Sequence, residues 1–350
     1  MSVVGGVEQV AASLANALTE KYNVHLISLC LMNGDKSAYA LNEKVIFKNL
    51  LEKDSRLLDM RKKAKKVLKD YFEKNNIDTA LILGNYPGFI CSGVKTKAKL
   101  VFCDHGALMN QWHQKDIVVL RFVASLQCDR VVTLTKQSHD DYLRKFHLSK
   151  KKVSYIYNWI DTDVPHSESY DVTSKKIISA GRFGKEKGFE NLAKAFALVS
   201  QKHPDWSLDI YGDGEMMEEV RRVVVEEKLE GKLNLPGMVS DLASKYKEYA
   251  MYVLPSYREG MPLVLLEAKL NKLPIVSYDI MTGPREIIRD GVDGILVPPQ
   301  DIEKMAESIC KLIENEELRK SMSEKTYENL GEFSKKEILA KWIELIEEKK

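Results

Sequence analysis

Two glutamates bracket an apolar stretch in the second half of the chain. The segment Tyr257–Ala268 reads YREGMPLVLLEA and places Glu259 and Glu267 eight positions apart. This spacing alone means little, because Glu218 and Glu226 show it within a segment crowded with charge, where a solvated helix face explains both carboxylates. Glu267 differs, since its neighbours are apolar on all sides of a helix and a carboxylate there is costly without a partner. The segment either binds a polar ligand or forms a structural turn followed by a satisfied buried glutamate.

The residues around the two glutamates predict a strand, a loop and a buried helix. Met251–Leu254 is an expected strand, Pro255 stops it, and Pro262 is expected as the first residue of the helix. Glu259 then lies in the loop at the carboxyl end of the strand, and Glu267 lies more than one turn into the helix. The first turn of a helix leaves backbone N–H groups that can bind an anion. The candidate donors are the amides of Gly260, Met261, Leu263 and Val264.

Other loops that follow expected strands also carry glycine or charge. The loop GRFGKEKGF at 181–189 contains Arg182 and Lys187, and two cations before a helix suit a diphosphate. Further loops of this kind are YGDGE at 211–215, LPGMVSD at 235–241 and TGPREII at 282–288. Met238, in the third of these, could contact a flat base. Because the carboxyl ends of parallel strands meet at one edge of a sheet, we expect these loops to form one ligand site.

Strands and helices alternate along both halves of the chain. The expected strands are 24–31, 79–83, 100–102, 130–134 and 153–157, and then 177–180, 207–211, 233–235, 251–254 and 274–277. This alternation predicts an α/β fold with two doubly wound parallel sheets, each covered by helices on both faces. The segment 161–176 loses periodicity and gathers Asp, Ser, Pro and Thr, as linkers do. We therefore expect two Rossmann-like domains that face each other across a cleft.

The predicted division of the chain is 1–165, 166–333 and a C-terminal helix at 334–350. The sequence SKKE from Ser334 is a capping box for that helix, which we expect to pack back toward the first domain. Met1–Val4 is barely long enough for the strand that should precede the first helix. The first strand is therefore expected to be short or missing.

The composition favours a globular protein with a core. Of the 350 residues, 44% are apolar, and no apolar run approaches the length of about 20 residues that a membrane span needs. We expect no signal peptide. The five cysteines are an odd number, widely spaced, and without metal-binding spacing among themselves, so we expect reduced core residues in a cytoplasmic protein.

Charge is distributed unevenly between the two halves. Residues 1–152 hold 25 Lys and Arg against 15 Asp and Glu, a balance of +10, and the remainder holds 28 against 36, a balance of −8. Such an asymmetry indicates an anionic partner for the first half, and no nucleic acid is expected. The densest basic segment, Arg61–Lys74, is an amphipathic helix that either binds an anionic membrane surface or packs its apolar stripe into the core. The expected stripe consists of Leu57, Met60, Ala64, Val67 and Tyr71.

In their order along the chain, these segments resemble the family 4 retaining glycosyltransferases, which have the GT-B fold of two facing Rossmann-like domains. Each motif is loose, but the ordered set is specific and spans nearly the whole chain. The motifs are GGVE from Gly5, DHG from Asp104, YNWID from Tyr157, GR from Gly181, KG from Lys187, GDG from Gly212, and the segment Glu259–Glu267.

The resemblance implies a role for each candidate residue. Glu267 would accept hydrogen bonds from the ribose hydroxyls, Glu259 would bind the donor hexose near the reacting carbon, and His105 would touch the donor sugar. Arg182 and Lys187 would neutralise the diphosphate as it leaves. The remaining implied contacts are Met238, Gly260, Met261, Pro262 and Leu263 for the donor, and Gly5 and Gly6 on the acceptor side.

The implied activity is transfer of a hexose or N-acetylhexosamine from a nucleotide diphosphate sugar, expected to be a UDP-sugar, to an acceptor hydroxyl with retention. The family implies neither a metal nor a cofactor, and the Asp-x-Asp sequence from Asp161 lies in the linker. Segment 282–287 is similar to members that build surface polysaccharides, so a glycan or lipid-linked acceptor and a cytoplasmic, peripheral membrane location are expected. The alternatives are a nucleotide-sugar epimerase on the same fold and a non-catalytic partner subunit. Intact Arg182, Lys187, Glu259 and Glu267 favour the transferase.

Overall fold

The computed structural model describes residues 6–29, 37, 39–51, 57–161, 166, 169–239 and 241–349. These residues form two compact units: one runs up to Asn158 and also takes in the residues from Ile338 onward, and the other is Trp159–Glu337. Residues 1–5 and 162–165 lie outside the described residues. The predicted short first strand, Gly5 and the predicted end of the first domain therefore fall on residues that the structure does not describe.

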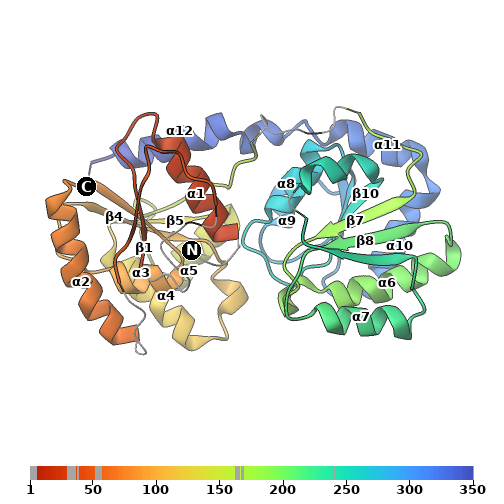
Figure 1. Ribbon diagram of the computed structural model, residues 1–350, viewed down its shortest axis with the longest axis horizontal. Helices are drawn as coiled ribbons and strands as arrows, with labels where there is room; N and C mark the ends of the chain where they lie inside the picture. Colours follow the sequence, from red (N-terminus) through yellow and green to blue (C-terminus); the bar gives the residue numbers. More distant parts are fainter. Residues whose placement is uncertain are drawn as a thin grey trace. The chain divides into compact units, whose positions relative to one another are not determined.

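The first unit is built on a parallel sheet in the order β3-β4-β5-β6 (Figure 1). Every residue of β4 is buried, as expected for a central strand covered on both faces. A separate parallel pair, β1 and β2, lies outside this sheet. The strands are β1 His25–Ser28, β2 Ile46–Asn49, β3 Thr79–Leu83, β4 Lys99–Asp104, β5 Arg130–Thr133 and β6 Val153–Tyr155. The sequence predicted all of them except β2, which is short and half-exposed.

The helices of the first unit include the last helix of the chain. Their bounds are α1 Gly6–Leu18, α2 Leu57–Lys74, α3 Asn85–Cys91, α4 Lys115–Gln127, α5 Lys136–Phe146 and α12 Lys335–Glu347, with a 3-10 turn η1 at Met109–Gln111. Ser334 Oγ accepts a hydrogen bond from the Glu337 amide at 3.4 Å, where the capping box was predicted. After α12, the carbonyl of Glu348 accepts a hydrogen bond of 2.7 Å from the buried ammonium of Lys99.

Helix α2 packs its apolar residues into the core of the first unit. The buried members of its stripe are Met60, Ala64, Leu68 and Phe72. The predicted members Leu57, Val67 and Tyr71 are partly buried and pack against the same core. Arg61 is also buried, with its guanidinium 4.2 Å from the centre of the Phe89 ring. The exposed basic residues of α2 are Lys62, Lys63, Lys65, Lys66, Lys69 and Lys74.

The second unit contains a six-stranded parallel sheet in the order β12-β11-β10-β7-β8-β9. The strands are β7 Lys176–Ala180, β8 Ser207–Tyr211, β9 Leu233–Gly237, β10 Met251–Leu254, β11 Ile275–Tyr278 and β12 Gly294–Val297. The sequence predicted all of these except the edge strand β12. The strand order reverses between β7 and β10, and ligands bind beyond the carboxyl ends of the strands at such a switch point.

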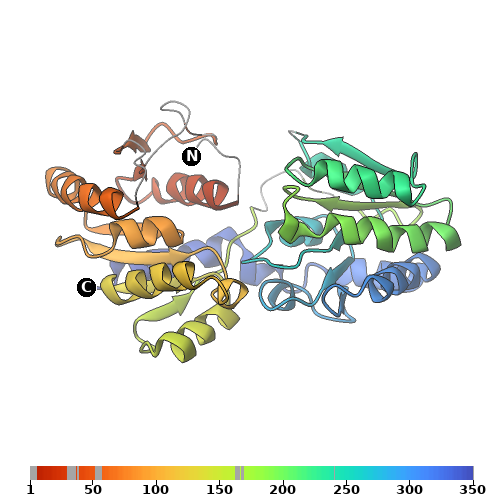
Figure 2. The ribbon, with the colours of Figure 1, turned by 90° about the horizontal axis from the view of Figure 1, so that it is seen from below.

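Helices cover both faces of this sheet. Helices α6, α7 and α10 lie on one face, and α8 and α9 lie on the other (Figures 1 and 2). Their bounds are α6 Phe189–Lys202, α7 Met217–Glu226, α8 Leu263–Leu270, α9 Pro284–Ile287, α10 Ile302–Glu314 and α11 Glu316–Lys325. Three 3-10 segments complete the unit: η2 Lys185–Lys187, η3 Ala243–Glu248 and η4 Leu330–Phe333. The predicted α/β class with parallel sheets is confirmed.

Two predictions from composition can be checked on the described residues. Cys91, Cys103, Cys128 and Cys310 are buried and unpaired, whereas Cys30 lies outside the described part of the chain. Burial raises the pKa of the Cys91 thiol to about 12. Within the same described ranges, none of the helices has both the length and the apolar content needed to cross a membrane.

Candidate active site

An ion pair joins the two loops that flank the switch point of the second sheet. Lys187, in the loop after β7, places Nζ 2.7 Å from Oε1 of Glu259, which lies in the loop after β10. Ser256 Oγ also donates to this carboxylate oxygen at 2.7 Å. The two charged side chains are 19% and 11% exposed, so both remain partly accessible to solvent. The sequence predicted both residues separately, and the structure brings them together.

Glycines allow these loops to approach one another closely. Gly188 has φ +65°, and a Cβ at this position would lie 2.3 Å from the carbonyl oxygen of Pro255. A Cβ on Gly212, which has φ +128°, would lie 1.9 Å from the carbonyl oxygen of Gly181. A side chain cannot be accommodated at either distance. The loops after β7, β8 and β10 therefore form one continuous edge only because glycine occupies these positions.

Arg182 lies in the same loop as Lys187 but has a different partner. Its guanidinium donates to Glu186 Oε1 at 2.8 Å, and its side chain is 65% exposed. Each cation of the predicted pair therefore has its own carboxylate, Glu186 for Arg182 and Glu259 for Lys187. A diphosphate that binds here must compete with both carboxylates. The sequence analysis did not identify Glu186, whose only local signal is its position four residues after Arg182.

The loop before α8 is held by the loop after β11. Thr282 Oγ1 donates to the carbonyl oxygen of Glu259 at 2.6 Å, and a Cβ on Gly283 would lie 2.6 Å from Cδ of Pro262. The helix begins at Leu263, and Pro262 is its N-cap residue rather than its first residue, so the predicted start was wrong by one position. Proline at this position, with φ −75° and ψ 108°, leads the chain into the helix.

The amides predicted to bind an anion lie at the start of α8. Met261 and Pro262 are buried, and Gly260, Leu263 and Val264 are half-buried. The first N–H groups of any α-helix have no carbonyl partner within the helix. These groups follow Glu259 along the chain, after strand β10 at the switch point of the sheet.

Glu267 is held by a buried tyrosine. Tyr246, in η3, is fully buried and donates from its hydroxyl to Glu267 Oε2 at 2.8 Å. Burial raises the pKa of the Glu267 carboxyl, and the hydrogen bond from Tyr246 acts in the opposite direction. Leu265, Leu266 and Ala268 are buried, as predicted, but Glu267 itself is only half-buried. Tyr246 is 21 residues away in sequence and carries no local signal of this contact.

Met238 lies at the same edge of the sheet, farther from the switch point. It follows the outer strand β9 directly and is 69% exposed. Strand β8 separates β9 from β7 in the sheet. Met238 is therefore accessible to a ligand, at the far end of the row of loops from Glu259.

His105 belongs to the first unit, at the carboxyl end of β4. Its Nε2 atom is buried and has no hydrogen-bond partner among the described residues. Burial lowers the pKa of His105 to about 4, and the neighbouring Asp104 carboxylate opposes that shift only in part. The imidazole is therefore neutral at pH 7. A neutral ring with an unused nitrogen can form a hydrogen bond with a bound molecule.

A buried charged network supports the loop that carries His105. Asp104 pairs with Arg121 Nε at 2.9 Å, and both side chains are 1% exposed. Tyr142 donates from its hydroxyl to Asp104 Oδ2 at 2.7 Å, and the amide of Gly106 donates to Oδ1 at 3.1 Å. Each of these three contacts fixes the Asp104 carboxylate and hence the turn that follows it. The sequence analysis did not identify Arg121 or Tyr142 as part of this arrangement.

The acceptor-side prediction falls at the start of α1. Gly6 is the first residue of this helix, it is exposed, and a Cβ at this position would meet nothing within 4 Å. Gly5 lies outside the described residues. The acceptor-side role of both glycines stays a prediction.

Comparison with known proteins adds two family matches. Residues 163–329 match the family model described as "Glycosyl transferases group 1", and residues 4–164 match "Glycosyltransferase Family 4". An uncharacterized glycosyltransferase of Haemophilus influenzae is 27% identical over 97% of this chain and 95% of its own length. A Campylobacter jejuni protein is 28% identical over 95% of this chain and 94% of its own length. Its name is N-acetylgalactosamine-N,N'-diacetylbacillosaminyl-diphospho-undecaprenol 4-alpha-N-acetylgalactosaminyltransferase.

Solved structures share the fold. Sucrose-phosphate synthase from Thermosynechococcus elongatus aligns with a TM-score of 0.84 over 98% of this chain and 93% of its own, at 19% identity. An Anabaena protein in complex with UDP and glucose aligns with a TM-score of 0.79 over 99% and 97%, at 17% identity. Because the two family models follow one another from residue 4 to residue 329, the chain belongs to the family 4 glycosyltransferases, with the GT-B fold.

Proposed function

We propose that this glycosyltransferase moves a hexose or N-acetylhexosamine from a UDP-sugar to a glycan or lipid-linked acceptor in surface polysaccharide synthesis, with retention at the anomeric carbon. The observation that carries this proposal is the ion pair of Lys187 and Glu259 at the switch point of the second sheet. One group can bind phosphate and the other can accept hydrogen bonds from sugar hydroxyls. A sugar diphosphate needs both, next to each other.

The second unit offers a complementary group for each part of the donor. Lys187 and Arg182 match the two negative phosphates, and the amides at the start of α8 add donors for the same oxygens. Glu267 offers a carboxylate oriented by Tyr246 to the two hydroxyls of a ribose. As the bond to the anomeric carbon breaks, the diphosphate gains charge, and cations fixed beside it lower the energy of that transition state.

The relatives support the choice of donor and acceptor. The Campylobacter jejuni protein is named as a transferase of N-acetylgalactosamine, with an alpha linkage, to a sugar attached to diphospho-undecaprenol. The Anabaena protein was solved with UDP and glucose. A UDP-sugar donor and a lipid-linked acceptor are therefore the first molecules to test on this chain.

We propose that transfer requires neither a metal ion nor a cofactor. In the described part of the second unit, the charges beside the switch point include two cations, each paired with a carboxylate. Cations of this kind can take the role that a divalent ion has with other diphosphates. Addition of a chelator should leave turnover unchanged.

The first unit is proposed to bind the acceptor. Gly5 and Gly6 are proposed on the acceptor side, and His105 is proposed to contact the donor sugar. Its basic balance of +10 suits the diphosphate of a lipid-linked acceptor and an anionic membrane surface. The stripe of α2 is occupied by core packing, so contact with a membrane would use the exposed lysines and not apolar insertion.

The experiment is to incubate the purified protein with a panel of labelled UDP- and GDP-sugars and an undecaprenyl-diphosphate-linked acceptor, with and without chelator. Transfer with retention, read by NMR of the new linkage, is the expected product. An epimerised nucleotide sugar would identify the epimerase, and no product with any donor would favour the non-catalytic subunit. Family membership favours transfer over both alternatives.

A further inference from the structure

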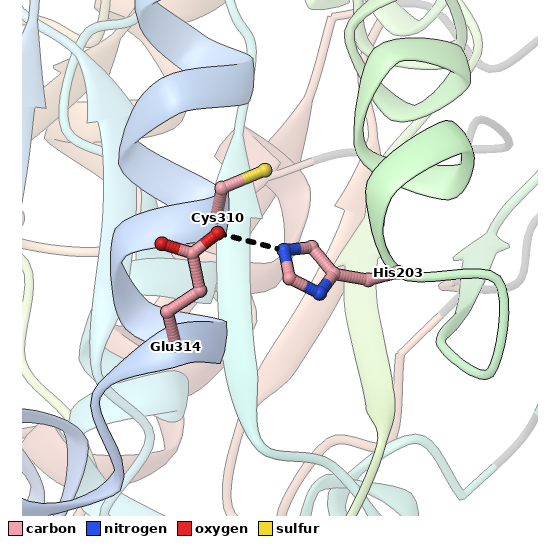
Figure 3. A group of neighbouring side chains, drawn as sticks. All are labelled: His203, Cys310 and Glu314. Atoms are coloured by element: carbon pink, nitrogen blue, oxygen red, sulfur yellow. Dashed lines mark hydrogen bonds and ion pairs between the residues drawn. The ribbon is translucent and has the colours of Figure 1, made fainter.

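Three side chains of different chemistry meet where two helices of the second unit end. His203 follows the last residue of α6 directly, and Cys310 and Glu314 lie one turn apart on the same face of α10. Figure 3 shows the imidazole reaching from the end of α6 toward the two residues of α10. A thiol, an imidazole and a carboxylate thus come from two separate helices to one place.

The geometry of these side chains is close to that of a metal site. His203 Nε2 and Glu314 Oε1 are 3.0 Å apart, and the ligand atoms of all three residues lie within 4.8 Å of one another. Ligand atoms around a tetrahedral zinc ion, with bonds of about 2.0–2.3 Å, are about 3.3–3.8 Å apart. Displacements of about 1 Å in the Cys310 and Glu314 side chains would therefore bring the three ligand atoms to bonding distance from a central ion.

We propose that His203, Cys310 and Glu314 bind a Zn²⁺ ion, with water as the fourth ligand. A mixed sulfur, nitrogen and oxygen set favours zinc over magnesium and calcium, which prefer oxygen ligands alone. On binding, the Zn–S bond forms as the thiol proton of Cys310 leaves to solvent, and Zn²⁺ takes the place of any proton between Nε2 and Glu314. The Glu314 side chain is 58% exposed and provides the path of entry.

Cys310 is buried, His203 is half-buried and Glu314 is exposed, so the three side chains lie at the boundary between the core and solvent. Cys310 belongs to the apolar core between α6 and α10, and its sulfur lies within 4.8 Å of the ligand atoms of His203 and Glu314. A cation held there would join the ends of two helices that otherwise contact through apolar packing.

The site lies at the opposite edge of the sheet from the donor loops. Helix α6 starts after the carboxyl end of β7 and finishes before β8, so its last residues are at the amino edge of the sheet. Helix α10, which follows β12, runs the same way. The ion would stabilise the second unit without touching the diphosphate site, and this inference does not depend on the proposed transfer reaction.

The test uses the full chain after chelator treatment, titrated with Co²⁺ and then Zn²⁺. We expect one equivalent of Co²⁺ to give a thiolate-to-cobalt absorption band that Zn²⁺ abolishes. The band should be lost in Cys310→Ser and kept in the matched control Cys128→Ser, which changes a buried cysteine of the first unit. Absence of the band in the wild type, or its persistence in Cys310→Ser, would overturn the proposal.

A second pair of variants keeps the test valid if Cys310→Ser fails to fold. His203→Gln and Glu314→Gln change side chains that are partly exposed and should fold, which circular dichroism checks. Zn²⁺ affinity by calorimetry should fall at least about 10-fold in each, because even residues that only support a ligand cost about 10- to 100-fold. Wild-type affinity in both variants would show that the three residues are only an ion pair beside a packed cysteine.

Discussion

The two units of the molecule use charge in opposite ways at the carboxyl ends of their strands. In the second unit, Lys187 and Glu259 pair at partly exposed positions, where a ligand can replace either partner. In the first unit, Asp104 and Arg121 are almost completely enclosed, and Tyr142 and a backbone amide use the remaining carboxylate positions. The enclosed network supports a turn, and the group presented for binding is neutral His105. The interaction partners of a charged residue therefore indicate its role better than its amino-acid type does.

Removal of the enclosed cation should have the largest effect. Arg121→Met leaves Asp104 buried without its partner, and the expected loss in the free energy of unfolding is about 3–5 kcal/mol. Chemical denaturation measures it. The control Lys69→Met removes a cation from the exposed pair with Glu73, which should cost less than about 0.5 kcal/mol. Similar small losses in both variants would contradict the supporting role of the network.

The exposed lysines of α2 extend the comparison to the surface. Changing Lys62, Lys63, Lys65 and Lys66 to Gln should weaken binding to anionic vesicles by up to about 4 kcal/mol at low salt, from about 1 kcal/mol for each basic residue. Salt should reduce the difference. Sedimentation with anionic and neutral vesicles measures binding. A matched variant removes four exposed lysines of the acidic second unit: Lys194, Lys228, Lys304 and Lys311.

Equal loss of vesicle binding in the two quadruple variants would show that only net charge matters. No preference of the wild type for anionic vesicles would leave the lysines as a solvated face. Because the apolar stripe of α2 lies in the core, the prediction includes no binding to neutral vesicles.

Changes to the partly exposed ion pair of Lys187 and Glu259 should affect turnover and not folding. Lys187→Ala removes a cation beside the leaving diphosphate, and the expected decrease in kcat is about 100-fold, typical of a lost electrostatic contact in a transition state. Arg182→Ala should decrease kcat less, because that side chain is largely exposed and paired with Glu186. Lys185→Ala, in the same loop and exposed, is the control and should keep wild-type turnover. Wild-type kcat in Lys187→Ala would exclude the leaving-group role.

Loss of Glu267 should weaken nucleotide binding more than loss of the tyrosine hydroxyl that orients it. Glu267→Ala is expected to weaken UDP binding by about 1.5–3 kcal/mol, the value of a hydrogen bond to a charged group. Tyr246→Phe, which keeps the carboxylate and removes one hydrogen bond to it, should cost about 0.5–1.5 kcal/mol. Calorimetry with UDP measures both, with Glu248→Ala in the same 3-10 segment as the control. Unchanged affinity in Glu267→Ala would end the ribose assignment.

The sequence predicted the parts of the site whose signals are local. Arg182, Lys187 and Glu259 lie in loops that follow strands, and Glu267 lies in the helix after one of these loops. The parallel sheet brings the carboxyl ends of those strands to one edge. The contacts that it missed join residues far apart in sequence, such as Tyr246 with Glu267 and Tyr142 with Asp104. A tyrosine in an apolar segment has the same local pattern whether its hydroxyl meets a carboxylate, a carbonyl or water.

The missed strands have a related explanation. Strands β2 and β12 each pair with a single neighbouring strand and are only partly buried. Strand β12 lies at the edge of its sheet and pairs with β11 alone, so packing on neighbouring elements determines it more than its own residues do. The predicted stripe of α2 omitted Leu68 and Phe72, which are buried beside the predicted members Val67 and Tyr71.

The smallest predicted effect concerns the acid stability that His105 confers on the first unit. The folded protein holds the pKa of His105 at about 4, below the ordinary value of 6.5 that applies to the unfolded chain. Between these values the unfolded chain binds a proton that the folded chain does not, so the free energy of unfolding decreases as pH falls from 6.5 to about 4. Above that window the contribution of the neutral ring is fully present, and below it no further change is expected.

His105→Gln should remove this part of the pH dependence, because glutamine does not titrate. The side chain is half-buried, so water limits the difference between wild type and variant to about 1 kcal/mol, less than the full shift would give at 1.36 kcal/mol per pKa unit. Urea denaturation at pH values across the window measures the slope. An unchanged slope in His105→Gln would mean that His105 has the same pKa in the folded and unfolded chains, so that burial does not hold the ring neutral between pH 6.5 and 4.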